Sequence, residues 1–195
     1  MSFSPPDRAK LLAVVVAVIG VAYPFIVYAA MGRVPAGALV LLALILAGAR
    51  LVMVRGGAIA GMLAPPLVLV LVGTAALGLV NGQWGSLGYP VLMNLAFAFA
   101  FGWSLRRPPS LVQVFASRAE PDPSPRAIAY MRKVSALWCA FLMVNALVTL
   151  ALALWAEVAV WALYTGLISY LLMGVLFAGE WLVRRHVRRA EQAMP

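Results

Sequence analysis

Polar side chains stand inside apolar segments at places where they could bind a ligand. Asn94 and Asn145 each lie within a long apolar run, with no acidic or basic residue close by in the sequence. Asparagines in such positions either form hydrogen bonds between helices or line a polar substrate pocket.

Charged residues at the ends of two apolar runs are further candidates. Glu180 and Arg184 have i,i+4 spacing, which favours an ion pair at a membrane interface, whereas a deeper Glu180 would suit proton relay. Arg106 and Arg107 could anchor the topology, or bind a lipid phosphate or the phosphopantetheine of a carrier protein. The candidate ligand or partner contacts are therefore Asn94, Arg106, Arg107, Asn145, Glu180 and Arg184.

The sequence lacks the residue groups that are typical of enzymes and metalloproteins. Cys139 is the single cysteine and His186 the single histidine, which excludes an internal disulfide and the usual thiolate or multi-histidine metal sites. It contains no phosphate loop and no HExxH motif. We expect no catalytic residue, no metal and no cofactor in a protein that is not an enzyme. A membrane enzyme acting on an acyl chain stays open as a third possibility.

Composition indicates that membrane spans carry these residues. Of 195 residues, 65% are hydrophobic and 11% are charged, whereas soluble domains have about 45–50% apolar and about 25% charged residues. The net charge of +9 comes from short basic clusters between apolar runs. This arrangement is typical of orientation in a membrane and argues against binding of nucleic acid.

The apolar runs predict an all-α fold, a polytopic membrane helix bundle, because each can cross a hydrocarbon core of ~30 Å. We expect a single integral membrane domain over residues 1–195, with about six transmembrane helices at 11–31, 36–54, 58–80, 88–105, 134–154 and 159–183. Pro24 predicts a kink in the first span. Pro65 and Pro66 predict a kink in the third span or its start.

Two smaller features are predicted around the spans. Arg50 is expected about one helical turn from the membrane interface, where its guanidinium can extend to the headgroups and needs no buried partner. Residues 81–85 are expected to form a short uncharged loop before the fourth span.

The long polar stretch 106–133 predicts a loop that contains a short amphipathic helix on the membrane surface. Ser110 and Gln113 have the spacing of a capping box. Ser124 followed by Pro125 predicts the start of a new helix that leads into the fifth span. Three apolar residues of the short helix share one face: Leu111, Val114 and Phe115.

Basic residues predict the orientation. If both termini are cytoplasmic, Arg33 is the only one of the 15 lysines and arginines on the outer side of the membrane, as the positive-inside rule predicts. We therefore expect a multi-pass protein of the bacterial inner (plasma) membrane with both termini and the loop 106–133 in the cytoplasm.

Several segments resemble a known family. The junction Trp103–Pro109, the aromatic run Leu137–Asn145 and the segment Tyr170–Leu182 are similar to those of the intracellular septation protein A family, or of a sister group of uncharacterised bacterial inner-membrane proteins. The septation family implies a non-enzymatic partner in envelope synthesis and division. The sister group, which Glu180 and Trp181 resemble better, implies a role near lipid or polyene-like products.

We expect from the sequence a non-enzymatic inner-membrane accessory or scaffold protein for envelope or lipid-linked biosynthesis. Its expected partners are membrane lipids, anionic ones included, and a cytoplasmic or membrane protein. The alternative is a small transporter or flippase for a lipid-like or acyl substrate, using a groove between the last three spans. A buried, water-filled cavity would favour transport, whereas a packed bundle with an exposed apolar groove would favour the scaffold.

Overall fold

The computed structural model describes residues 5–54, 57–117 and 122–192, and these residues form helices and no strand. Six helical segments are long and apolar enough to cross a membrane. They are α1 (Pro5–Ala30), α2 (Ala36–Met53), α3 (Gly57–Val80), α4 (Gly82–Arg106), α6 (Pro125–Trp155) and the continuous run of α7 (Val158–Leu163), the π-helix η1 (Tyr164–Ile168) and α8 (Ser169–Gln192). The predicted all-α polytopic bundle is confirmed, and these helices indicate a multi-pass membrane protein.

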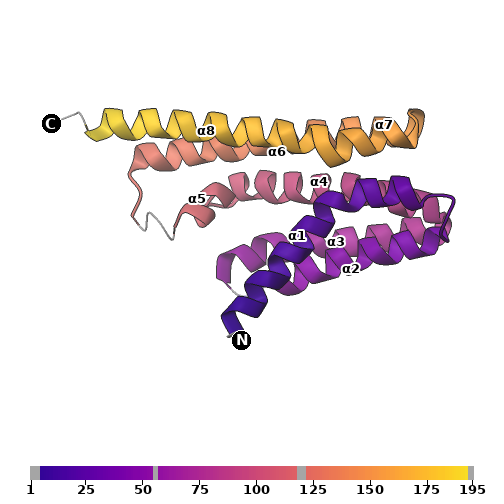
Figure 1. Cartoon of the computed structure of the whole chain (residues 1–195). Coiled ribbons are helices and arrows are strands. Elements are labelled where there is room, and N and C mark those ends of the chain that lie inside the picture. Colours follow the sequence, from indigo (N-terminus) through magenta and orange to yellow (C-terminus); the bar gives the residue numbers. More distant parts are fainter. Residues whose placement is uncertain (1–4, 55–56, 118–121, 193–195) are drawn as a thin grey trace.

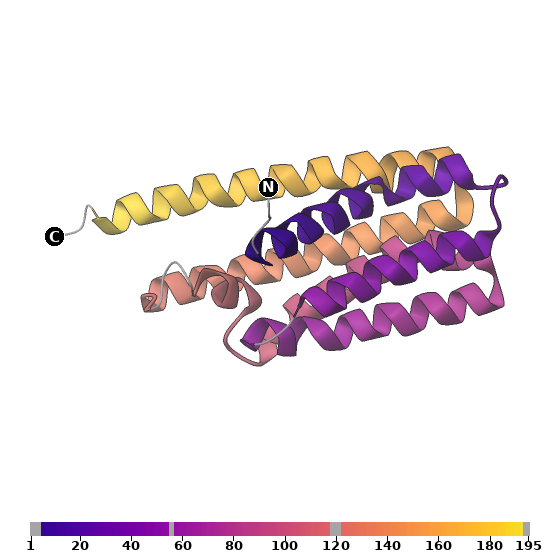
Figure 2. The same ribbon diagram turned by 60° about the horizontal axis from the view of Figure 1, so that its bottom comes forward.

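The two ends of the bundle differ in what they contain. Figures 1 and 2 show both termini at one end, which we call the termini end, together with the α2–α3 connection and the segment around α5 (Leu111–Ala116). The α1–α2, α3–α4 and α6–α7 connections lie at the opposite end, called the far end.

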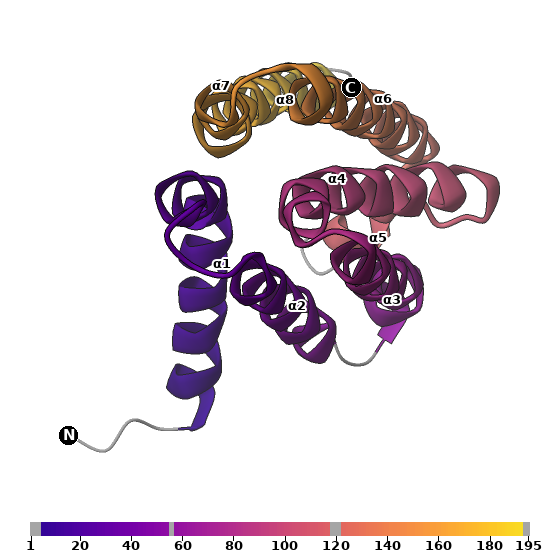
Figure 3. The ribbon, with the colours of Figure 1, turned by 90° about the vertical axis from the view of Figure 1, so that its right-hand side faces the viewer.

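The helices pack around α4, which lies between α3 and α6 (Figure 3). One apolar cluster joins α1, α2, α3, α4 and α7, and includes the fully buried Tyr23 and Trp161. A second cluster joins α3, α4, α5 and α6, and includes Leu67, Leu111 and Trp138. α8 lies beside α6, where the rings of Trp138 and Phe177 are 4.4 Å apart.

Prolines shape two helices differently from one another. α1 continues through Pro24, and Figure 1 shows its first half bending away from the bundle. Proline lacks an N–H and therefore removes one hydrogen bond of the helix, so the bend agrees with the predicted kink. α3 contains Pro65 and Pro66 in its interior and begins at Gly57, so the span does not begin at the prolines.

The loop predicted at 81–85 is wrong, because α4 already begins at Gly82. The Asn81 side chain caps it, with Oδ1 accepting hydrogen bonds from the backbone N–H of Gln83 at 2.8 Å and Trp84 at 3.3 Å. The fourth span therefore starts six residues before the predicted 88, as the bounds of α4 show.

The predicted helix start at Ser124 and Pro125 is confirmed. Ser124 Oγ accepts a hydrogen bond of 3.2 Å from the backbone N–H of Ala127, and α6 continues without a break from Pro125 to Trp155. Residues 118–121 of the preceding loop lie outside the described part of the chain.

The short helix of the loop exists, but its predicted capping box does not form. The Ser110 side chain makes no capping hydrogen bond. Instead, Ser104 Oγ on α4 accepts a hydrogen bond of 2.9 Å from the backbone N–H of Leu111, and Ser135 Oγ on α6 accepts one of 3.3 Å from Val112. Two neighbouring membrane helices therefore cap α5, a relationship that local spacing does not encode.

The apolar face of α5 packs against protein rather than inserting into the membrane surface. Leu111 and Val114 are buried in the bundle, and only Phe115 of the predicted stripe is exposed. The predicted membrane docking of this stripe is therefore wrong for two of its three residues. Leu111 packs against a complementary apolar surface formed by α3, α4 and α6.

Candidate functional site

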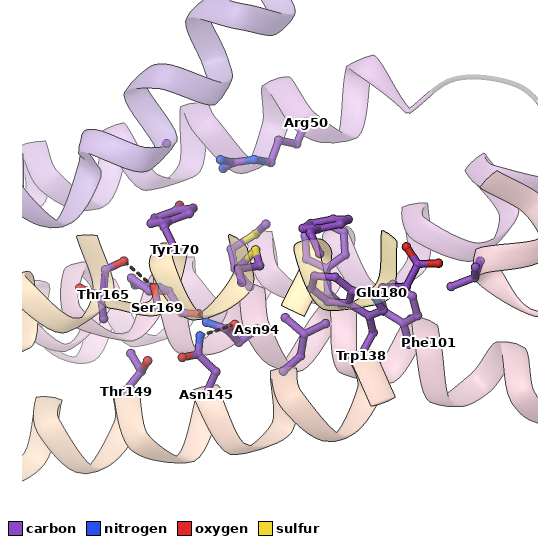
Figure 4. A pocket seen from close by; sticks show the side chains of 18 of the residues that line it. Arg50, Asn94, Phe101, Trp138, Asn145, Thr149, Thr165, Ser169, Tyr170 and Glu180 are labelled. Carbon is purple, nitrogen blue, oxygen red and sulfur yellow. Dashed lines mark hydrogen bonds between the residues drawn. The ribbon is translucent and has the colours of Figure 1, made fainter. Parts of the chain in front are cut away.

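A cavity of about 620 Å³ lies among α1, α2, α4, α6 and α8, and α5 borders it at the termini end. This volume falls within the range of about 300–1,000 Å³ that is typical of small-ligand sites. Most of its lining is apolar, with polar side chains at several depths. Figure 4 shows these polar groups spaced along the groove between α8 and the helices opposite.

Asn94 and Asn145 come together at the middle of the cavity. Asn145 Nδ2 donates a hydrogen bond of 2.9 Å to Asn94 Oδ1, and the Tyr164 hydroxyl donates one of 2.8 Å to Asn145 Oδ1. Asn94 Nδ2 in turn donates to the Pro90 carbonyl at 2.8 Å. The asparagine pair therefore links α4 to α6, and both residues also line the cavity.

Hydroxyl groups line the part of the cavity nearer the far end. Thr165 Oγ1 donates to the Trp161 carbonyl at 2.7 Å, and Ser169 Oγ donates to the Thr165 carbonyl at 3.0 Å. Thr149 Oγ1 is buried and has no hydrogen-bond partner among the described residues. A buried hydroxyl without a partner carries a desolvation cost, which a polar ligand group can relieve.

Glu180 and Arg184 line the end of the cavity nearest the termini. The Tyr130 hydroxyl donates a hydrogen bond of 3.3 Å to the Glu180 carbonyl and so connects α6 with α8 there. Aromatic rings of Phe101 and Trp138 lie next to Glu180 (Figure 4). The expected pairing of Glu180 with Arg184 stays a prediction.

Arg50 does not extend to the headgroups, so that prediction is wrong. Its Nη1 donates a hydrogen bond to the Tyr89 hydroxyl, and its guanidinium lies against Gly20 of α1. Figure 4 shows Arg50 reaching into the groove toward Tyr170 of α8. Side chains on a helix lean toward its N-terminus, and α2 begins at the far end, so the lean directs Arg50 into the bundle.

Arg106 and Arg107 lie apart from the cavity. Both are exposed at the end of α4, and the Arg107 guanidinium carbon lies 4.9 Å from the centre of the Trp103 ring. A cation over an indole ring is a favourable contact that holds the side chain at the surface. These two residues form a separate basic surface at the termini end.

The cavity's charged groups suit binding of an anion more than binding of a metal. Among the described residues that line it, Glu180 is the only carboxylate, against Arg50 and Arg184. Within the described part of the chain, no cluster of three or more His, Cys, Asp or Glu side chains could hold a metal ion. The expected lack of a metal or cofactor stays a prediction.

Sequence reasoning missed Arg50 and the hydroxyls of Thr149, Thr165 and Ser169. Arg50 carried a usable signal, because it is a charged residue within a predicted span and the direction of that span was already predicted. The hydroxyls carried none, since threonine and serine in a span commonly bond their own helix.

Comparisons with protein families, with curated proteins and with solved structures gave no match. The resemblance to the septation family therefore stays a prediction, and the site is interpreted from its own geometry.

Proposed function

We propose that this chain is a small transporter or flippase of the bacterial inner membrane that moves a lipid-like or acyl amphiphile along the cavity. The cavity itself carries the proposal, because its apolar walls enclose polar groups at three depths: Thr149, Thr165 and Ser169, then Asn94 and Asn145, then Glu180 and Arg184. Apolar walls accommodate a hydrocarbon chain. Successive polar groups lower the cost of moving a polar headgroup through the hydrocarbon region.

Charge supports an orientation with both termini in the cytoplasm. Arg33 belongs to the α1–α2 connection at the far end, whereas Arg106, Arg107, Arg126 and Arg132 belong to the termini end. Short cytoplasmic segments are enriched in basic residues, so the termini end is proposed to face the cytoplasm.

The scaffold function remains a second candidate because of Arg106 and Arg107. They are exposed beside α5, and α5 itself is fixed to α4 and α6 by the serine caps described above. A rigid basic surface of this kind suits binding of an anionic lipid surface or an acidic protein partner. Neither candidate function involves covalent chemistry, and the expectation that the protein is not an enzyme stays a prediction.

Translocation in liposomes tests the transporter proposal. The full chain is reconstituted with an alkyl phosphate that carries a fluorophore at the end of its chain, and an impermeant reductant bleaches the molecules in the outer leaflet. We expect the inner-leaflet molecules to be bleached faster in liposomes that contain the intact protein than in protein-free liposomes. Asn145→Leu should reduce this rate. Thr74→Val is the matched control, because Thr74 is buried in α3 away from the cavity.

The two candidate functions predict opposite orders of effect. Transport requires the intramembrane asparagine, so Asn145→Leu should reduce function more than the double change Arg106→Ala with Arg107→Ala. The scaffold function requires the exposed arginines and predicts the reverse order. A bleaching rate equal to that of protein-free liposomes would rule out the transporter proposal.

A further inference from the structure

We propose that Arg50 is the binding site for the anionic headgroup of a single-chain amphiphile, either a carboxylate or a phosphate monoester, held inside the cavity. This inference rests on the proposed function, since it specifies the class of molecule that the cavity accepts. It is carried by the position of the guanidinium, by its surroundings and by the open side of the cavity.

Glycine at position 20 makes room for the guanidinium. A Cβ atom at Gly20 would overlap Nη2 of Arg50 and would lie 3.2 Å from its Cζ. Any larger residue there would push the guanidinium away from α1. The hydroxyl of Tyr89, on α4, accepts a hydrogen bond from the Arg50 guanidinium. Contacts with α1 and α4 therefore hold this charge at the cavity wall.

The guanidinium retains hydrogen-bonding capacity for a ligand. It has five N–H donors, and the hydrogen bond to Tyr89 uses one of them. Among the described residues lining the cavity, the only carboxylate is Glu180, which lies near the termini end with Phe101 and Trp138 beside it. A cation within a span is costly unless an opposite charge accompanies it, and a bidentate carboxylate or phosphate provides that charge.

The cavity is partly open rather than sealed within the bundle. The residues of α1 that line it are Gly20, Tyr23 and Pro24, and none comes from the preceding half of the helix. Figures 1 and 3 show this first half diverging from α8 toward the amino terminus. The proposed entry for an amphiphile of the adjoining leaflet is between α1 and α8 at the termini end.

The chain of the amphiphile then has an apolar surface to occupy. Phe97 and Phe101 of α4, Trp138 of α6 and Phe177 of α8 line the cavity beyond the guanidinium. Trp138 and Phe177 have ring centres 4.4 Å apart. The cavity of about 620 Å³ is the size of a site for one small ligand, which favours a molecule with one chain.

Competition binding with matched headgroups tests this inference. The purified full chain in detergent is labelled with a photoreactive fatty acid, and unlabelled hexadecanoate, hexadecyl phosphate or hexadecanol competes. The three competitors share one alkyl chain and differ in headgroup. We expect both anions to compete more strongly than the alcohol, and the stronger anion identifies the headgroup as carboxylate or phosphate.

Two arginine variants locate the effect. Arg50→Gln should weaken competition by the better anion about 10- to 100-fold and leave hexadecanol unchanged, because a charge-assisted hydrogen bond is lost. Arg107→Gln removes the same charge from the exposed end of α4, apart from the cavity, and should preserve the discrimination. Arg50→Lys keeps the charge and should retain preference for anions.

Each outcome decides a different point. Equal competition by all three molecules in the unaltered protein overturns the headgroup inference and leaves the proposed function intact. This result needs no variant, so misfolding of Arg50→Gln cannot obscure it. The inference is also overturned if the preference for anions over hexadecanol is lost in Arg184→Gln but kept in Arg50→Gln. Failure of every competitor contradicts the proposed function itself.

Discussion

Asn145 donates a hydrogen bond of 2.9 Å from Nδ2 to Asn94 Oδ1 and thereby joins α6 to α4 beside the cavity. The Tyr164 hydroxyl donates to the second polar atom of Asn145, Oδ1. Asn145 is therefore the central member of a three-residue chain, and its loss leaves two partners unsatisfied.

A double-mutant cycle on the asparagine pair should show this asymmetry. We expect Asn94→Leu and Asn145→Leu each to lower the free energy of unfolding by about 0.6–2 kcal/mol, with the larger loss for Asn145→Leu. The double variant should lose less free energy of unfolding than the sum of the two single losses. Each single variant leaves the remaining asparagine without its partner, and the double variant removes both. Thermal unfolding in detergent measures all four proteins, and strictly additive losses would contradict the coupling.

Cysteine labelling should establish the orientation of the bundle. In a Cys139→Ser background, Gln83→Cys at the far end should react with an impermeant thiol reagent added to intact cells, and Ser117→Cys should not. Both positions are exposed. Gly85 is unsuitable, because a Cβ there would lie 2.7 Å from Gly78 Cα. Labelling of Ser117→Cys from outside would reverse the proposed orientation.

Substitution of Gly20 should disturb the headgroup site without changing any charge. Gly20→Ala places a methyl group where the Arg50 guanidinium lies, so affinity for hexadecanoate should fall while affinity for hexadecanol stays constant. Gly174→Ala is the matched control, since a Cβ there meets no atom within 4 Å. Competition binding measures both variants. If Gly20→Ala and Gly174→Ala bind hexadecanoate with equal affinity, the result would argue against contact between Arg50 and α1.

Two residues of α5 should respond differently to truncation. Leu111→Ala should lower the free energy of unfolding by about 2–5 kcal/mol, because it leaves a cavity in the bundle. Phe115→Ala should cost less, since Phe115 is half-exposed and Leu111 is fully buried. Unfolding in detergent separates the two, and a larger loss for Phe115→Ala would indicate that α5 docks on the membrane through that residue.

The spans were predictable because each depends on a local property, the length of an apolar run. The start of α6 was predictable for the same reason, since Ser124 and Pro125 act on adjacent backbone. The capping of α5 by Ser104 and Ser135 was not, because the acceptors lie on two other helices. The contact between Asn94 and Asn145 likewise depends on how α4 and α6 are rotated about their axes.

Arg50 is an intermediate case. The sequence identified it as a charged residue in a span, and helix direction determines that its side chain leans into the bundle. Its two contacts, Gly20 on α1 and Tyr89 on α4, could not be predicted, because both lie on helices distant in sequence. The resulting position follows from three helices together.

The burial of Trp161 beside Tyr23 determines when the cavity can form during biosynthesis. Tyr23 lies on α1 and Trp161 on α7, 138 residues later in the chain, and both are fully buried in one cluster. Chains are synthesised from the amino terminus, so α1 enters the membrane before its final packing partner has been translated. Until then Asn145 has neither Tyr164 nor α8 beside it. Completion of the cavity is therefore a late step of membrane insertion. A chain that ends before Trp161 lacks α7, η1 and α8, so Asn145 of α6 has no partner from these helices.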